Sequence, residues 1–197
     1  MASKFPNFIV GIGGSAGAFN AYKALLDTLP SNTGMAFVII SHMSPDAQSQ
    51  LAQLLSKRTK MPVVVASQAM PILANHVYVI PADADLSIEG NVFKVVSPRT
   101  RRNAQVDLFF ISLAVVMSTR AIGIILSGYD GDGTEGCRQI KAKGGTTFAQ
   151  DRSAEVNHMP FSAEASGCVD FVLPLDKISE ELSKIGASFA KTQARAK

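Results

Sequence analysis

Short runs of apolar residues alternate with longer segments of helical spacing along most of this chain. The run Phe8–Ile12 ends in glycines, and Ala36–Ser41 is equally apolar. Near-continuous apolar runs of this length are typical of strands buried on both faces of a parallel sheet. The amphipathic segments between such runs, for example Ala18–Leu29 and Val106–Ser118, predict the crossover helices. The alternation therefore predicts the α/β class, as a three-layer, mostly parallel, doubly wound sheet.

The same pattern predicts the remaining elements. Further strands are expected at Val63–Ala66, Ala121–Leu126, Thr146–Ala149 and Val169–Leu173, and further helices from Ser44 to about Arg58, over Gly133–Lys143, over Phe161–Ala165 and from Asp176 to about Phe189. The alternation is interrupted by short strands at His76–Ile80, Asp85–Glu89 and Asn91–Val95, and the pair Gly90-Asn91 predicts a tight antiparallel hairpin inserted into the sheet. We expect one domain over residues 1–190 and a frayed basic tail over residues 191–197.

Composition excludes several classes of protein. Hydrophobic residues make up 47% and charged residues 18%, which excludes a disordered chain. The longest near-continuous apolar run, Leu108–Met117, is about half of what a membrane span needs, so no membrane insertion is expected. The net charge of +3 is too small to favour nucleic acid. No apolar signal core precedes the first strand, and Cys137 and Cys168 lie far apart, which favours a reduced cytoplasmic protein without a metal site.

The loop after the first strand has three interpretations. Residues Gly13–Gly17 match G-x-S-x-G, the turn that exposes a nucleophilic serine, here Ser15. Residues 11–16 also match the glycine pattern of a dinucleotide-binding turn. That pattern requires an acidic residue at the end of the second strand, where this chain has Ser41 and His42, which counts against a nicotinamide cofactor. The third interpretation is that Ser15 only caps the following helix.

Two further loops follow predicted strands at the same edge of the sheet. His42 comes directly after the second strand and is a candidate general base for Ser15, whereas His76 opens a strand and is expected to face away. The loop Ser127–Gly133 carries Asp130 and Asp132 among glycines. Residues 132–135 also resemble a capping box for the next helix, which would make Asp132 structural. Taken together, the three loops predict a triad of Ser15, His42 and Asp132.

With these loops in register, the chain resembles the catalytic domain of chemotaxis protein-glutamate methylesterases. The resemblance runs from about Phe8 to Leu182 and is closest to esterase domains fused to methyltransferase and sensory modules. It is carried by IVGIGGSAGA (9–18), FVIISHMSPD (37–46), HVYVIPADADL (76–86), VDLFFISLA (106–114), GIILSGYDGDGTEG (123–136), GGTTFAQD (144–151) and MPFSA (159–163).

The resemblance implies a cytoplasmic hydrolase of glutamyl γ-methyl esters on chemoreceptors, which releases methanol and in some members also deamidates glutamine. It implies Ser15 as the nucleophile, His42 as the base and Asp132 as the orienting carboxylate. The backbone of Ala16 and Tyr129 would lie near the oxyanion, with Met159 in the same pocket. No cofactor or metal is implied. The partners would be glutamate-rich receptor helices and a possible methyltransferase or sensory module.

Some residues depart from the family pattern. Tyr129 replaces methionine or a small residue, Asp130 adds a charge that can raise the pKa of a nearby imidazolium, and His158 replaces glycine. These changes keep open an alternative, a catalytically weakened sensory or docking module of the same fold. The cluster Arg99, Arg101 and Arg102 either steers an acidic substrate or is a solvated basic loop. For an active enzyme, we expect activity to fall as pH drops through the His42 pKa.

Overall fold

The computed structural model describes residues 5–42 and 45–195, with the backbone alone for residues 45–49. The strands of the main sheet are β1 (Phe8–Gly14), β2 (Met35–Ser41), β3 (Val63–Val65), β4 (His76–Val79), β7 (Ala121–Ile125), β8 (Thr146–Gln150) and β9 (Phe171–Leu173). The strands β5 (Asp85–Glu89) and β6 (Val92–Val96) form a separate antiparallel pair. The helices are α1 (Ala18–Thr28), α2 (Pro45–Leu55), α3 (Gln105–Met117), α4 (Thr134–Ala142), α5 (His158–Ala165) and α6 (Leu175–Arg195), with a 3₁₀ turn at Ser118–Arg120.

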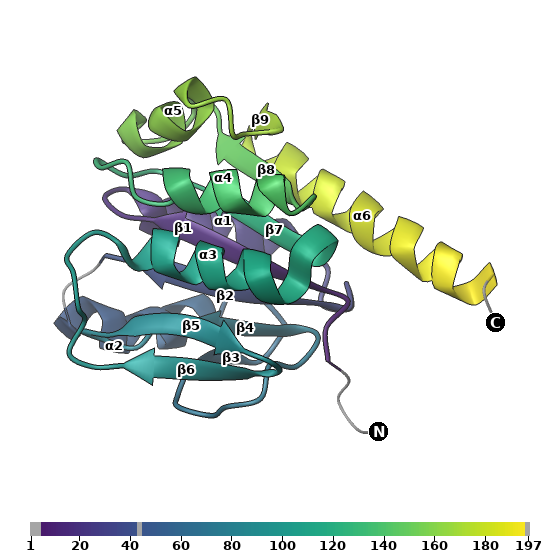
Figure 1. The fold of residues 1–197 in the computed structure, drawn as a ribbon, viewed down its shortest axis with the longest axis horizontal. Helices are drawn as coiled ribbons and strands as arrows, with labels where there is room; N and C mark the ends of the chain where they lie inside the picture. Colours follow the sequence, from purple (N-terminus) through teal and green to yellow (C-terminus); the bar gives the residue numbers. More distant parts are fainter. Residues whose placement is uncertain (1–4, 43–44, 196–197) are drawn as a thin grey trace.

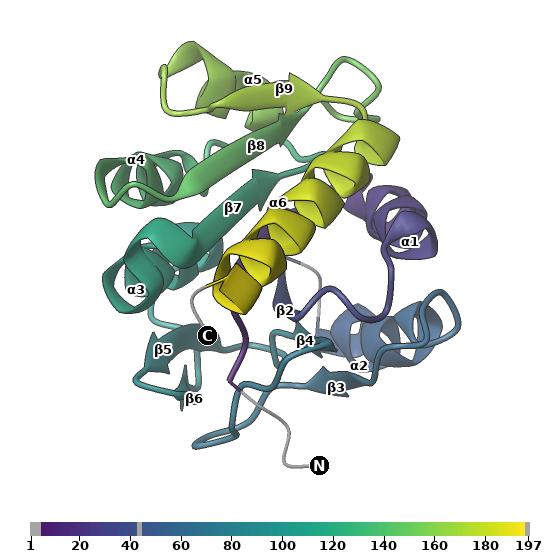
Figure 2. The ribbon, with the colours of Figure 1, turned by 90° about the vertical axis from the view of Figure 1, so that its right-hand side faces the viewer.

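The main sheet is wholly parallel, in the order β3-β4-β2-β1-β7-β8-β9. Helices cover both of its faces, as Figures 1 and 2 show: α3 and α4 lie on one face, and α1, α2 and α6 lie on the other. Two separate clusters of buried apolar side chains fill the two spaces between helices and sheet. The predicted three-layer, mostly parallel sheet with an inserted hairpin is confirmed.

Element boundaries differ from the predicted ones mainly near the C-terminus. Helix α5 begins at His158 rather than Phe161, and β9 is shorter than predicted. Helix α6 continues to Arg195, through most of the segment expected to be a frayed tail, because no glycine or proline interrupts residues 187–195. The predicted cap of α2 at Ser44 lies outside the described residues. No helix in the described part of the chain is long and apolar enough to cross a bilayer.

Candidate active site

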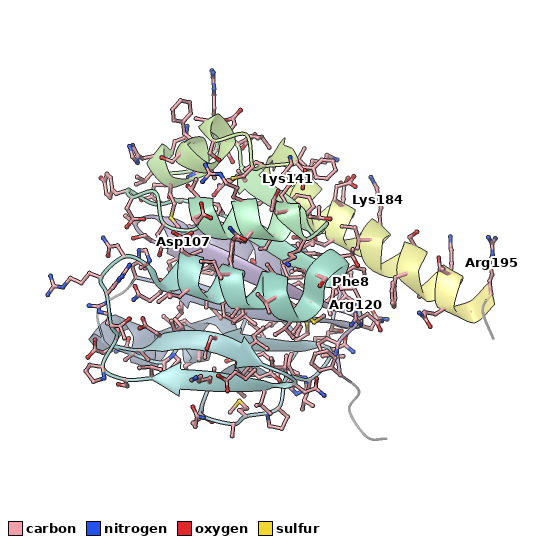
Figure 3. The ribbon with its side chains drawn as sticks, in the orientation of Figure 1. Phe8, Asp107, Arg120, Lys141, Lys184 and Arg195 are labelled. Atoms are coloured by element: carbon pink, nitrogen blue, oxygen red, sulfur yellow. The ribbon has the colours of Figure 1, made fainter. Side chains whose placement is uncertain are left out.

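Three loops meet at one edge of the sheet because the strands before them are adjacent and parallel. Strand β1 lies between β2 and β7, with Gly14 opposite Ser41 and Gly13 opposite Ile125. Ser15, His42 and the loop Ser127–Gly133 therefore leave the sheet at the same edge, where α/β sheets bind their ligands. Figure 3 shows Asp107 on the first turn of α3, toward this edge, and Phe8 and Arg120 at the opposite edge.

Ser15 lies in a tight turn between β1 and α1. Its N–H donates to the carbonyl of Ser127 at 2.9 Å, which ties the first loop to the loop after β7. The residue before α1 is Gly17, with φ of 74°, and no side chain caps this helix. The interpretation of Ser15 as a helix cap is therefore wrong, and its hydroxyl is not used by the N-terminus of α1.

The glycines of β1 have a packing role. A Cβ on Gly11 would lie 2.6 Å from the Phe110 ring, and one on Gly13 would overlap Val106. Helix α3 therefore rests directly on β1 only because these positions carry no side chain. Close packing of α3 accounts for the glycine pattern that also matched a dinucleotide-binding turn.

His42 and Asp132 are in direct contact. The Nε2 atom of His42 lies 2.6 Å from Oδ2 of Asp132, and both side chains are buried, at 4% and 0% exposure. The Asp132 carboxylate also accepts the N–H groups of Val106 and Asp107, each at 2.9 Å, at the start of α3. Asp132 thus caps α3 and not α4, so the capping-box interpretation is wrong. These bonds fix the carboxylate against the imidazole.

A second carboxylate approaches the other ring nitrogen of His42. Oδ2 of Asp130 lies 3.2 Å from Nδ1, within ion-pair distance, although the angles are poor for a hydrogen bond. Burial lowers the pKa of His42, but Asp130 and Asp132 together outweigh burial and raise this pKa to about 9. Burial likewise raises the pKa of Asp130, and its contact with His42 more than reverses this, so the pKa lies below its usual range. The resting imidazole is therefore a cation between two carboxylates.

Ser15 and His42 line the same cavity. This cavity has a volume of about 390 Å³ and is bounded by Ser15, Ala16, Gly17, Phe19 and His42. Among the described residues, no hydrogen bond joins the Ser15 hydroxyl to His42, and none uses the N–H groups of Ala16 or Tyr129. The structure thus places Ser15 and His42 on one cavity and Asp132 against the imidazole, with both ring nitrogens facing carboxylates. Ala16 lines this cavity, whereas Tyr129 does not.

Neither Tyr129 nor Met159 lines the cavity beside Ser15. The Tyr129 side chain is 70% exposed, so the phenol does not fill the cavity. Met159 is completely buried and lies under Gly128, where its N–H donates to the Gly128 carbonyl at 2.9 Å. Met159 therefore supports the loop after β7 from below and does not line the cavity beside Ser15.

The arginine cluster lies in the segment that joins β6 to α3. Arg99 pairs with Asp83 at 3.3 Å, and Arg101 and Arg102 are exposed. Because α3 starts beside Asp132, this segment approaches the same edge of the sheet as the cavity. Arg101 and Arg102 are thus available to a substrate, whereas Arg99 is partly engaged.

Ser127 is a site residue that the sequence did not single out. It is fully buried, and its hydroxyl donates to the Ala16 carbonyl at 2.7 Å while accepting the Val156 N–H at 2.9 Å. Ser127 thereby holds the turn that contains Ser15. The signal that could have identified Ser127 is its position as a polar residue directly after the apolar run Ala121–Leu126. No group of three potential metal-ligating side chains gathers within the described residues.

Comparisons with known proteins agree with one another. The family model for CheB methylesterase matches residues 10–182. A relative from Leptospira interrogans is 35% identical over 173 residues, which is 86% of this chain and 90% of that protein. A protein from Hydrogenovibrio crunogenus named protein-glutamate methylesterase/protein-glutamine glutaminase is 33% identical over 187 residues, 91% of this chain and 50% of that protein. The chain thus spans about half the length of the second relative.

A solved structure shares the fold. The crystal structure of the Thermotoga maritima CheB methylesterase catalytic domain matches with a TM-score of 0.83 and 29% identity. The match covers 90% of this chain and 98% of the crystallised chain.

Proposed function

Because the chain belongs to the CheB methylesterase family, we propose that it hydrolyses glutamyl γ-methyl esters on chemoreceptor-type proteins through Ser15, His42 and Asp132. The main support is the shared cavity of Ser15 and His42, with Asp132 2.6 Å behind the imidazole. A methyl ester has a carbonyl that an activated serine can attack. Substrate glutamates on the cytoplasmic helices of receptors would place the enzyme in the cytoplasm, alone or beside a methyltransferase or sensory module.

The proposed reaction has two steps. Neutral His42 takes the proton of the Ser15 hydroxyl while Oγ bonds to the ester carbonyl carbon. The carbonyl oxygen becomes an oxyanion, which the N–H groups of Ala16 and Tyr129 stabilise. The C–O bond then breaks, and methanol leaves with the proton held by His42. Water, deprotonated by His42, then attacks the acyl carbon, and the bond from this carbon to Ser15 Oγ breaks as Oγ takes the proton back from His42. The product acid loses its own proton to solvent and leaves as the glutamate carboxylate.

His42 must change its state before the first step. An imidazolium between Asp130 and Asp132 has no lone pair for the serine proton. The active form therefore requires loss of one proton and a turn of the ring that directs a nitrogen toward Ser15. Asp132, which α3 fixes through two N–H groups, remains to orient the ring.

The same acyl chemistry extends to glutamine. An amide would follow the same path with ammonia as the leaving group, in line with the glutaminase activity in the name of the Hydrogenovibrio relative. We expect the amide to react more slowly, because an amide carbonyl is less reactive than an ester carbonyl.

The test is methanol release from methylated receptor, together with hydrolysis of a small chromogenic ester. Wild type should turn over both, and Ser15→Ala should lose at least about a thousandfold in rate. Equal rates in the two proteins would remove Ser15 from the mechanism. If neither substrate reacts, even with Tyr129→Met, while receptor fragments still bind, the chain is a docking module.

A further inference from the structure

A groove continues from the candidate active site along α1. The cavity at Ser15 shares Phe19 with a neighbouring cavity of about 380 Å³. That cavity in turn shares Lys57 and Arg58 with a third cavity of about 630 Å³, which reaches the loop after α1. We call the second and third cavities the α1–α2 groove, since their walls come from α1, the end of α2 and the loops that follow both helices. Figure 2 shows α1 and α2 side by side on one face of the sheet.

The walls of the α1–α2 groove are strongly basic. Its lining residues include four cations, Lys23, Lys57, Arg58 and Lys60, and a single carboxylate, Asp27. Arg58 and Asp27 approach to 3.5 Å, and both side chains are more than 40% exposed, so this pair is weak. Among the described side chains, those of residues 5–42 and 50–195, Lys57 and Lys60 form no ion pair. The groove therefore carries a local positive charge out of proportion to the modest net charge of the chain.

The end of the groove nearest the catalytic edge is also apolar. Phe19 contributes to both the catalytic cavity and the groove, and the ammonium of Lys23 lies 4.6 Å from the centre of its ring. Across the groove, Leu54 of α2 is 40% exposed. An apolar floor beside cationic walls suits an amphipathic segment with carboxylates on its polar side.

We propose that the α1–α2 groove binds an acidic helical segment of the substrate, adjacent to the side chain that carries the ester. This inference rests on the proposed function, because it names the partner of the same site. Helix α1 has 11 residues and is about 16 Å long, so a bound helix would place about three turns along it. Carboxylates at i and i+4 on such a helix would face Lys57 and Arg58 while the ester side chain reaches Ser15.

Binding can be measured apart from catalysis. The probe is a helical peptide of about 20 residues with glutamates at i, i+4 spacing and one glutamyl γ-methyl ester, bound to Ser15→Ala. Adding Lys57→Gln and Arg58→Gln should raise Kd about fivefold, and binding should weaken with salt. Both side chains are exposed, so the fold should be unaffected. A peptide with glutamine in place of the glutamates should bind weakly to both proteins.

The matched control removes the same charge elsewhere. Arg120→Gln with Lys143→Gln takes two cations from the opposite edge of the sheet, where Figure 3 shows Arg120. This control should leave Kd for the acidic peptide unchanged. An equal loss of binding in both double variants would show that only the net charge of the protein matters, and would overturn the proposal. Unchanged binding in the Lys57/Arg58 variant would overturn it as well.

Turnover separates the groove from the chemistry. With Ser15 present, the Lys57/Arg58 variant should raise KM for the acidic peptide about fivefold and leave hydrolysis of a small neutral ester unchanged. A wild type that binds the peptide but hydrolyses neither substrate would count against the proposed function and leave the groove supported. An unchanged KM for the acidic peptide would count against the groove alone.

Discussion

At the scale of single residues, the protonation of His42 controls the candidate site. Its side chain is 4% exposed and faces Asp130 and Asp132, which raise its pKa to about 9 in spite of burial. A histidine of ordinary pKa would be mostly neutral at pH 7.5, whereas His42 in this arrangement is mostly protonated. A triad holds one carboxylate beside its imidazole, whereas this site holds two, because Asp130 lies against the second ring nitrogen of His42.

We predict that kcat/KM rises with pH and reaches half of its maximum near pH 9 in wild type, because the free enzyme must lose the His42 proton to act as a base. Asp130→Asn removes one of the two charges and should shift this midpoint down by about one pH unit, which raises activity at neutral pH. The measurement is a pH–rate profile with a small ester.

Asp151→Asn is the matched control, since it removes a carboxylate that the structure does not pair with His42. Its profile should superimpose on that of wild type. A midpoint near pH 6.5 in wild type would contradict the double pairing of His42.

At the scale of elements, α3 connects the sheet to the site. Its N-terminal half rests on the glycines of β1, and its first turn donates two N–H groups to Asp132. The position of the carboxylate beside His42 therefore depends on the seating of a whole helix. Two substitutions test this dependence, one in strand β1 and one in the loop after β7.

Gly13→Ala should destabilise the protein by about 1–3 kcal/mol, because the new methyl group overlaps Val106 and pushes α3 away from β1. The free energy of unfolding in urea measures this loss. Gly131→Ala is the control, since the nearest atom to its added Cβ is 3.9 Å away. Equal stability of Gly13→Ala and wild type would show that α3 does not need this close approach.

Asp132→Ala should lose about 1–2 kcal/mol of stability, because two N–H groups at the start of α3 lose their acceptor. Asp132→Asn keeps one carbonyl oxygen and should lose less, although both variants should lose esterase activity. Urea unfolding and an ester assay on both proteins separate the two roles. Identical stability losses would mean that the cap contributes nothing beyond the charge.

At the scale of the whole molecule, the raised pKa of His42 links proton binding to folding. A histidine with a pKa near 6.5 when unfolded and about 9 when folded stabilises the native state fully below about pH 6.5. This contribution is lost as pH rises through 9. The contact with Cys137 lowers the pKa of the Cys168 thiol to about 6. Ionisation of this thiol therefore stabilises the native state as pH rises over the same range, which is opposite to the effect of His42.

A comparison of two proteins isolates the contribution of His42, since Cys168 is present in both. The free energy of unfolding of wild type should exceed that of Asp130→Asn by more at pH 6 than at pH 9.5, because only below the folded pKa is the imidazolium available to Asp130. Denaturation at both pH values measures the difference. A constant gap across this range would show that Asp130 does not stabilise the imidazolium.

Local patterns in the sequence predicted the fold closely. Apolar runs identified the strands, and Gly90-Asn91 identified the hairpin, whose strands pair from Asp85 with Val96 to Glu89 with Val92. Adjacent crossovers also predicted that β1 and β2 pair, which places His42 beside Ser15. These features depend on neighbouring residues or on one crossover, so they can be predicted from the local sequence.

Long-range contacts were not predictable in the same way. The cap on α3 comes from Asp132, 26 residues further along, whereas the local sequence favoured a cap on α4. The α1–α2 groove combines Lys23 with cations that follow α2, and Ser127 braces Ala16 across 111 residues. Each of these contacts requires the packed sheet, which brings the segments together only after it forms.

The exposed end of the long final helix offers an attachment point far from the candidate active site. Helix α6 extends away from the body toward the side opposite the candidate catalytic loops (Figure 1), and Figure 3 shows Arg195 at its far end. Its residues from 191 to 195 are exposed and bury nothing. A dye or a surface tether attached there would leave the candidate catalytic rim turned toward the bulk liquid, so immobilised molecules should all present this rim in the same orientation.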